Sequence, residues 1–141
     1  MKRKASAVWQ GDLKSGKGNI STESGVLKQT QYSFSTRFEN GIGTNPEELV
    51  AAAHAGCFSM AFSAELGRAG FTPETIFTTA TVTLDKTDAG FTVTESNLEM
   101  TAKIPGIDAE KFTAIANGAK AGCPISRLLN ARVTLDAVLE K

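Results

Sequence analysis

The residues of this chain best suited to chemistry are its two cysteines, Cys57 and Cys123, which lie 66 positions apart. Each stands in a distinctive local sequence. Cys57 follows Asn45-Pro46-Glu47-Glu48-Leu49 and a stretch of small residues, and Cys123 lies within Ala121-Gly122-Cys123-Pro124-Ile125-Ser126. A cysteine can serve as a nucleophile, a metal ligand or half of a disulfide. The compartment of the protein therefore bears on which chemistry to expect.

The N-terminal sequence does not predict export. Met1-Lys2-Arg3-Lys4 is basic, as at the start of a signal peptide, but residues 5–12 contain no apolar run of the required length. The longest apolar stretch, Leu49–Ala64, is interrupted by His54 and is shorter than the roughly 18 residues of a membrane span. We therefore expect a soluble, cytoplasmic protein, in which cysteines stay reduced and rarely form structural disulfides.

A reactive cysteine needs a cation beside it. With an unperturbed pKa near 8.5, only about 3% of a thiol is ionised at pH 7, and burial raises the pKa further. One candidate cation is His54, one helical turn before Cys57. The better-placed candidate is Arg37, which we predict at the end of an apolar strand. An arginine stays charged, and a carboxylate such as Glu47 can hold it in place.

Each of these residues also has an ordinary structural explanation. A buried cysteine on a helix is usually a small apolar residue. His54 could be a packed core histidine and Arg37 a solvated strand residue, while Glu47 and Glu48 suit the start of any helix. Two cysteines and one histidine without close spacing cannot form a closed zinc site, so we expect no metal. The residues by themselves indicate a candidate thiol enzyme.

The elements that must position these residues begin with strands and a long helix. Residues 4–10 and 31–38 alternate as strands do, with turn signals between them, so the N-terminal third predicts a β-meander. Residues 46–69 predict a helix, because Asn45 is a suitable N-cap and Pro46 a suitable first residue. Gly70 is suited to end that helix.

The second half of the chain predicts a hairpin, two helical segments and a last strand. Residues 75–85 and 91–104 are β candidates joined at Asp88-Ala89-Gly90. A helix over residues 108–121, a helical turn after Pro124 and a strand over residues 132–139 follow. The order βββ-α-ββ-α-β is that of an α+β fold, and 141 residues fit one domain.

The long helix also predicts self-association. Its middle, residues 51–57, is mostly small and has little polar face, so another backbone can approach closely. A monomer of this size has little material to wrap such a helix, and we expect a dimer with helices packed together. The 15 basic and 15 acidic residues cancel, which argues against a nucleic-acid or membrane-surface partner.

Three separated motifs resemble the OsmC/Ohr family, the osmotically inducible and organic hydroperoxide resistance proteins. They are Thr36-Arg37-Phe38 with Gly43-Thr44-Asn45-Pro46-Glu47-Glu48-Leu49, then Ala52-Ala53-His54-Ala55-Gly56-Cys57-Phe58-Ser59-Met60-Ala61, and finally Lys120-Ala121-Gly122-Cys123-Pro124. The resemblance covers essentially the whole chain. A histidine at position 54, where a tyrosine would be the alternative, points to the OsmC branch.

The resemblance implies one OsmC-like domain over residues 1–141, in an interlocked homodimer with two active sites at the subunit interface. It implies a thiol-dependent peroxidase that reduces organic hydroperoxides to alcohols, and hydrogen peroxide less efficiently. By position, Cys57 is the thiol that becomes a sulfenic acid, and Cys123 condenses with it to an intramolecular disulfide. Arg37 is the activating cation and Glu47 its carboxylate partner. No bound cofactor is implied, only an external thiol or dithiol reductant.

For such a peroxidase, ionising the thiol is not enough. Lowering the pKa to about 6 requires about 3.4 kcal/mol and raises the thiolate fraction about thirtyfold. The nucleophilicity of a thiolate falls as its pKa falls. If peroxide attack behaves like thiol exchange, this loss reduces the gain in rate about tenfold. We therefore expect the cation also to stabilise the departing oxygen as the O–O bond breaks. Phe34, Phe58 and Met60 are candidates for the wall of an organic-peroxide pocket.

Two other functions fit the residues. The first is a non-catalytic dimer that binds an apolar small molecule between its helices and uses the cysteines for packing or as a slow redox sensor. The second is a thioesterase-like α+β enzyme with Glu47 or His54 as its base. Reactivity of Cys57 at pH 6 distinguishes the peroxidase from the binding protein, and thioester hydrolysis that survives Cys57→Ser would favour the thioesterase.

Overall fold

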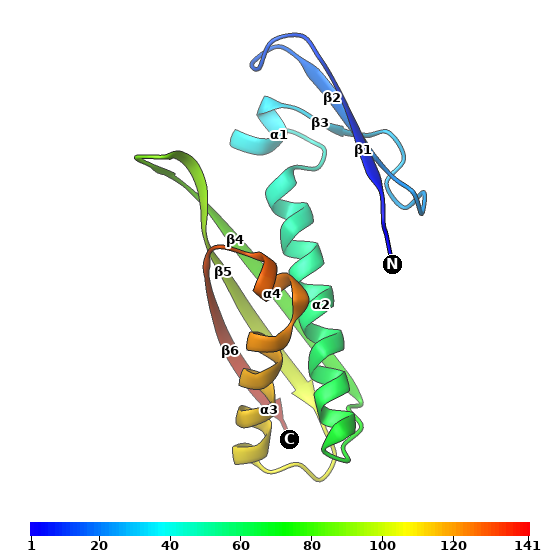
Figure 1. The fold of residues 1–141 in the computed structure, drawn as a ribbon, viewed down its shortest axis with the longest axis vertical. Helices are drawn as coiled ribbons and strands as arrows, with labels where there is room; N and C mark the ends of the chain where they lie inside the picture. Colours follow the sequence, from blue (N-terminus) through cyan, green and yellow to red (C-terminus); the bar gives the residue numbers. More distant parts are fainter. The chain divides into compact units, whose positions relative to one another are not determined.

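The computed structural model describes residues 1–141, which form two compact units, Met1–Leu49 and Val50–Lys141. Strands both precede and follow a long helix, as Figure 1 shows. This is the α+β architecture predicted from the sequence, with its meander, long helix, hairpin, second helix and C-terminal strand. That both units belong to a single domain stays a prediction.

The first unit contains an antiparallel sheet of strands β1 (Ala5–Gln10), β2 (Lys17–Thr22) and β3 (Thr30–Tyr32). Gly18 pairs with Trp9 on one side and with Tyr32 on the other. A Cβ atom at Gly18 would lie 2.4 Å from the Tyr32 ring, so the glycine leaves the space in which the two rings meet. Their centroids are 5.4 Å apart, and the aromatic pair stabilises the sheet across its middle strand.

The strand predicted over residues 31–38 is wrong for most of its length, because Phe34–Phe38 form the short helix α1. Ser33 caps this helix. The N–H of Thr36 donates to Ser33 Oγ, and the N–H of Ser33 donates to Thr36 Oγ1 at 2.8 Å. This reciprocal capping box outweighs the alternating pattern that suggested a strand. Arg37 therefore lies in the last turn of a helix.

The long helix α2 runs from Pro46 to Arg68, within one residue of the prediction. Asn45 is its N-cap, since the N–H of Glu48 donates to Asn45 Oδ1 at 2.8 Å. At the other end Gly70 adopts a φ of +86°, and the next N–H donates to the carbonyl of Leu66 at 2.9 Å. The positive φ of Gly70 and this hydrogen bond form the glycine-terminated helix end that the sequence predicted.

Within this chain, helix α2 is covered on one face only. Its buried residues are His54, Phe58, Phe62 and Leu66. The other residues of the helix are partly or fully exposed in this chain. The uncovered face carries small residues and Met60, which is 77% exposed. By length and composition α2 is also able to cross a membrane, a property that core helices of soluble proteins share.

The second unit contains a sheet in the order β4 (Thr75–Thr87), β5 (Gly90–Lys103) and β6 (Arg132–Glu140). Strands β4 and β5 form the predicted hairpin, with Asp88-Ala89 at its tip. Strand β6 pairs with β5 in parallel. Burial alternates along β4, and in β5 the residues at the alternate positions Ser96, Leu98, Met100 and Ala102 are buried, whereas their neighbours are partly or fully exposed. The sheet therefore has one buried face.

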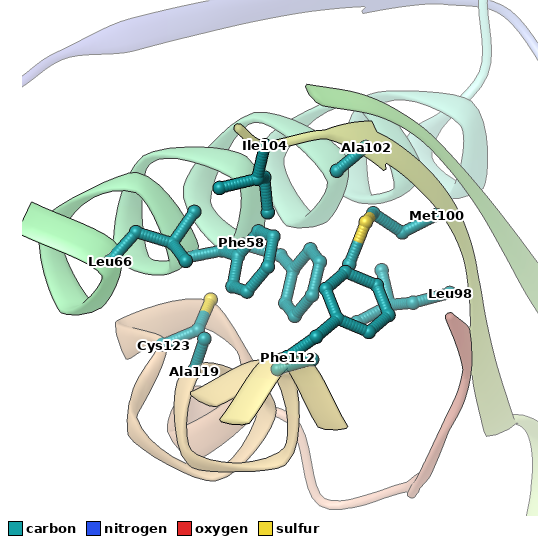
Figure 2. Packing of buried hydrophobic residues seen from close by; sticks show 11 residues of the cluster. Phe58, Leu66, Leu98, Met100, Ala102, Ile104, Phe112, Ala119 and Cys123 are labelled. Atoms are coloured by element: carbon teal, nitrogen blue, oxygen red, sulfur yellow. The ribbon is translucent and has the colours of Figure 1, made fainter. Parts of the chain in front are cut away.

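The covered face of this sheet packs against helices α2 and α3 (Ala109–Gly122), and α3 has the predicted N-cap, Asp108. The short helix α4 (Pro124–Leu128) follows α3 directly. Figure 2 shows the buried side chains of this core, which come from α2, β5, α3 and their ends. They are Phe58, Phe62, Leu66, Leu98, Met100, Ala102, Ile104, Phe112, Ala116, Ala119 and Cys123.

Candidate active site

The two cysteines lie side by side in the second unit. Cys57 projects from the middle of α2, and Cys123 lies at the junction between α3 and α4. Their sulfur atoms are 3.0 Å apart and share a hydrogen bond, and both thiols are free. Cys123 is fully buried, whereas Cys57 is half-buried. Two sulfur atoms in contact need only a small movement to reach the disulfide bond length of about 2.0 Å.

The junction between α3 and α4 fixes the position of Cys123. Its N–H donates to the carbonyl of Ala119 at 2.9 Å, and this bond ends α3. Pro124 then begins α4. A proline disfavours helical backbone in the residue before it, so the chain bends at Cys123. Figure 2 shows Cys123 with the core side chains, and this packing holds the thiol against α2.

The groups of the second unit do not activate Cys57. Burial raises the pKa of the Cys57 thiol, and the hydrogen bond with Cys123 raises it further, while the backbone of Ile125 partly opposes both. No cationic side chain is among the groups that shift this pKa. For Cys123, burial acts to raise the pKa, but hydrogen bonds with Cys57 and with Ser126 lower it overall.

His54 is a poor candidate for that cation. Its ring is fully buried on α2, with Nδ1 2.7 Å from Ser96 Oγ and Nε2 2.7 Å from Ser126 Oγ. Burial lowers the pKa of His54 from its ordinary value of 6.5, which favours the neutral ring at pH 7. Sequence reasoning missed both serines. The one available signal was Ser96, a polar residue at an inward position of β5 beside Leu98.

Arg37 and Glu47 form an ion pair in the first unit. Arg37 Nη2 donates to Glu47 Oε1 at 2.7 Å, and Nε lies 3.2 Å from both carboxylate oxygens. The guanidinium also lies 5.2 Å from the centroid of the Phe38 ring, a cation–π distance. The Arg37 side chain remains 35% exposed. The guanidinium of Arg37 thus has Glu47 and Phe38 as partners, and about a third of the Arg37 side chain stays accessible to a further partner.

A pocket of about 250 Å³ lies beside Arg37 in the first unit. Aromatic side chains dominate its wall, which consists of Trp9, Leu13, Tyr32, Ser33, Phe34, Arg37, Phe38 and Pro46. Of the pocket residues expected from the sequence, only Phe34 lies in this wall. Phe58 is instead fully buried in the core, and Met60 is exposed on α2. No group of three or more histidine, cysteine, aspartate or glutamate side chains is arranged to hold a metal ion.

Two free thiols in contact on an α+β fold form the kind of site that a dithiol redox protein uses. Comparison with known proteins identifies its family. Residues 39–138 match the model of the family described as OsmC-like protein. The chain belongs to the OsmC-like family.

Individual relatives agree with this assignment. The chain is 59% identical over 138 residues to Peroxiredoxin OsmC of Escherichia coli (strain K12), an alignment that covers 98% of this chain and 96% of that protein. It is 27% identical over 124 residues to the organic hydroperoxide resistance protein OhrB of Bacillus subtilis, covering 87% and 89% of the two chains. The solved structure of an OsmC-like protein of unknown function from Vibrio cholerae superimposes with a TM-score of 0.78 at 16% identity, covering 98% and 99%. The family and the fold that the sequence motifs implied are thereby confirmed.

Proposed function

We propose that this protein reduces organic hydroperoxides in a homodimer whose two active sites each combine the cysteine pair of one subunit with a clamped arginine. The class of activity, a cysteine-based peroxidase acting on a hydroperoxide and consuming a thiol reductant, follows from the close similarity to Peroxiredoxin OsmC at 59% identity. The observation that carries the mechanism is the contact between Cys57 and Cys123, whose sulfur atoms are 3.0 Å apart.

The reaction proceeds in three balanced steps. The Cys57 thiolate attacks the terminal oxygen of the hydroperoxide, so that an S–O bond forms, the O–O bond breaks and the alkoxide takes a proton to become the alcohol. Cys123 then attacks the sulfur of the Cys57 sulfenic acid, forming the disulfide and releasing water. Two equivalents of an external thiol, or one dithiol, reduce the disulfide and restore both thiols.

Arg37 supplies the positive charge in this proposal. It stabilises the Cys57 thiolate, and it binds the alkoxide oxygen as the O–O bond breaks. Two observations support this role. Burial and the hydrogen bond with Cys123 raise the pKa of the Cys57 thiol, so a positive charge is needed beside it to favour the thiolate. Glu47 fixes the guanidinium through a forked ion pair and leaves a third of the side chain exposed. The pocket beside Arg37, with its aromatic wall, suits the apolar group of an organic hydroperoxide.

Two surfaces of the chain support a homodimer. The first unit, Met1–Leu49, contributes no residue to the buried hydrophobic core, which lies entirely between Phe58 and Cys123. A unit of this size that buries no hydrophobic residue is not stable unless another surface covers it. In the second unit, the uncovered face of α2 carries Ala53, Gly56 and Met60. A second copy of α2 fits there, because small residues allow two helices to approach closely. We also propose that the dimer works in the cytoplasm, where free thiols persist.

A thiol count tests the proposed reaction. Reduced protein treated with one equivalent of cumene hydroperoxide should lose two thiols per chain and form no covalent dimer on a non-reducing gel. Retention of both thiols would reject the peroxidase mechanism. Loss of both thiols together with a covalent dimer would show that the disulfide joins two subunits and would reject intramolecular resolution by Cys123. Size-exclusion chromatography with light scattering tests the dimer separately.

A further inference from the structure

The side chain of Asn45 joins the two helices that carry the ion pair of the first unit. Its Nδ2 donates to the carbonyl of Thr36 in α1 at 3.1 Å, and its Oδ1 accepts from the N–H of Glu48 in α2 at 2.8 Å. Arg37 lies in the last turn of α1, and Glu47 lies in the first turn of α2. All of these residues belong to the first unit. Asn45 therefore does more than cap α2.

The partners of this amide fix its orientation. A backbone carbonyl only accepts a hydrogen bond, and a backbone N–H only donates one. The NH2 group of Asn45 therefore faces Thr36, and its oxygen faces Glu48. A flipped amide would place two acceptors together at one end and two donors together at the other. Each bond also satisfies a group near a helix end, where carbonyls and N–H groups have no partner within the helix.

The two backbone groups that Asn45 binds are directly attached to the ion pair. The carbonyl of Thr36 belongs to the peptide group that links Thr36 to Arg37, and the N–H of Glu48 belongs to the peptide group that links Glu47 to Glu48. A peptide group is planar, so a bond to one of its atoms also restrains the Cα atom of the neighbouring residue. The amide thereby helps to set the separation of the two backbones from which the guanidinium and the carboxylate extend.

The loop between the helices is anchored to the elements that precede α2. The N–H of Gly41 donates to the carbonyl of Ser35 in α1 at 3.2 Å, and the N–H of Thr44 donates to the carbonyl of Gln31 in β3 at 2.9 Å. These bonds hold the loop against α1 and β3. The bonds of Asn45 extend this set of contacts to α2.

We propose that Asn45 is a positioning residue for the peroxidase reaction: it binds the peptide groups next to Arg37 and Glu47 and so sets the geometry of their fork. The inference rests on the proposed function, in which Arg37 stabilises the thiolate of Cys57 and the departing oxygen. Asn45 takes no part in bond breaking or proton transfer, and it acts through Arg37.

Two substitutions separate the bridge between the helices from the cap of α2. Serine and aspartate cap helices about as well as asparagine, so Asn45→Ser and Asn45→Asp should both keep the bond from the N–H of Glu48. Neither keeps the donor to the carbonyl of Thr36, because the serine side chain is too short and aspartate has an acceptor in place of the NH2 group. Serine is neutral, so it shows whether the added charge of aspartate contributes to the result.

The rate of Cys57 oxidation by cumene hydroperoxide is the first measurement. A misplacement of about 1 Å away from the reacting atoms can cost about 100-fold in rate, so each Asn45 variant should be slower by about tenfold to 100-fold. The matched control is Asn117→Asp, because Asn117 Nδ2 also donates to a backbone carbonyl, that of Thr113 within α3, at 3.0 Å. The control should oxidise at the wild-type rate. Urea unfolding checks that each variant is folded in the assay.

A double-mutant cycle shows whether Asn45 acts through Arg37. In an Arg37→Ala background the fork is already absent, so Asn45→Ser should slow the oxidation further by less than about twofold. The same factor of slowing in both backgrounds would overturn the proposal. A wild-type rate in both Asn45→Ser and Asn45→Asp would overturn it as well.

Hydrogen exchange tests the positioning without any peroxide. Arg37 Nε lies 3.2 Å from both carboxylate oxygens of Glu47, so its N–H is protected from water while the fork is intact. The nitrogen NMR signal of this group is identified by its loss in Arg37→Lys. Its exchange with water should become faster by about threefold or more in Asn45→Ser and should not change in Asn117→Asp.

An unchanged exchange rate in Asn45→Ser would overturn the proposal. If wild type does not react with cumene hydroperoxide at all, the peroxidase function fails, while the exchange rate still decides whether Asn45 positions Arg37.

Discussion

Arg37 holds the carboxylate of Glu47 in a fork, with Nη2 2.7 Å from Oε1 and Nε 3.2 Å from both oxygens. A fork fixes the plane of the guanidinium as well as its position, which a lysine cannot do. The fork leaves the remaining donors of Arg37 aimed in a defined direction. A cation fixed in this way is suited to bind an oxygen that becomes charged only as its bond breaks.

Arg37→Ala should therefore slow the oxidation of Cys57 by about 100-fold to 1,000-fold, the usual effect of removing a donor that stabilises a transition state. Lost ionisation of the thiol accounts for only a few-fold of this. The measurements are the stopped-flow rate with cumene hydroperoxide and the pKa of Cys57, titrated in a Cys123→Ser background. Arg37→Lys restores the charge without the fork and should recover only part of the rate. A slowdown that the pKa change fully explains would remove the role in stabilising the departing oxygen.

The two cysteines should have unequal roles. Cys57→Ser should abolish turnover, because the half-buried thiol is the one that peroxide attacks. Cys123→Ser should still allow one oxidation per chain and should then retain a sulfenic acid, detected by dimedone labelling and mass spectrometry. Single-turnover oxidation that is as fast in Cys57→Ser as in wild type would reverse the assignment of the two roles.

Much of the fold was predictable because its elements carry local signals. Asn45 and Gly70 bound the long helix, and the Asp88-Ala89 turn joins two β-rich runs. The strand prediction at residues 31–38 failed because alternation was weighed above the Ser33 and Thr36 capping box, a signal that was present in the sequence. The parallel pairing of β6 with β5 has no local signal, since strand partners are chosen by packing across the whole unit.

The candidate site was less predictable. Nothing in the local sequence brings Cys57 to Cys123, and the pairing came from family resemblance. The contacts of His54 span 42 positions to Ser96 and 72 positions to Ser126, so neither could be inferred from spacing along a helix. Sequence reasoning also considered His54 as a cation. Burial, which is a property of the folded core, lowers its pKa and makes the neutral ring the expected form.

Removing the cap of α1 should affect both stability and rate. Ser33→Ala deletes the hydroxyl that accepts from the N–H of Thr36 and should lower the free energy of unfolding by about 1 kcal/mol. Because Arg37 lies in the last turn of this helix, the oxidation rate of Cys57 should fall as well. Urea unfolding and stopped-flow kinetics check the two effects. The control is Ser35→Ala, in the same helix, whose hydroxyl forms no hydrogen bond. Equal losses of oxidation rate in Ser33→Ala and Ser35→Ala would show that the rate does not depend on the cap.

The stability of the reduced protein should fall as the pH decreases from 7 to 5. His54 is the only histidine, and burial lowers its pKa below the ordinary value of 6.5. As the pH falls through 6.5, the unfolded chain takes up a proton that the folded core still rejects, so protonation favours unfolding. The slope of the unfolding free energy can approach about 1.4 kcal/mol per pH unit, and it levels off below the folded-state pKa.

That pH interval isolates His54 from the other shifted groups. Asp12 and Asp108 have pKa values lowered from 3.8, each first of all by hydrogen bonds within its own turn, so the stability they contribute is lost only in more acidic solution. Wild type and His54→Gln carry the same two cysteines, so any titration of a thiol in this interval contributes equally to both profiles. Urea unfolding of wild type and His54→Gln at pH 7.0, 6.0 and 5.0 is the measurement. Wild type should lose stability across the series and the variant should not, because glutamine does not titrate. A wild-type profile as flat as that of the variant would mean that His54 takes up a proton as readily in the folded protein as in the unfolded chain, and would contradict the neutral, buried ring.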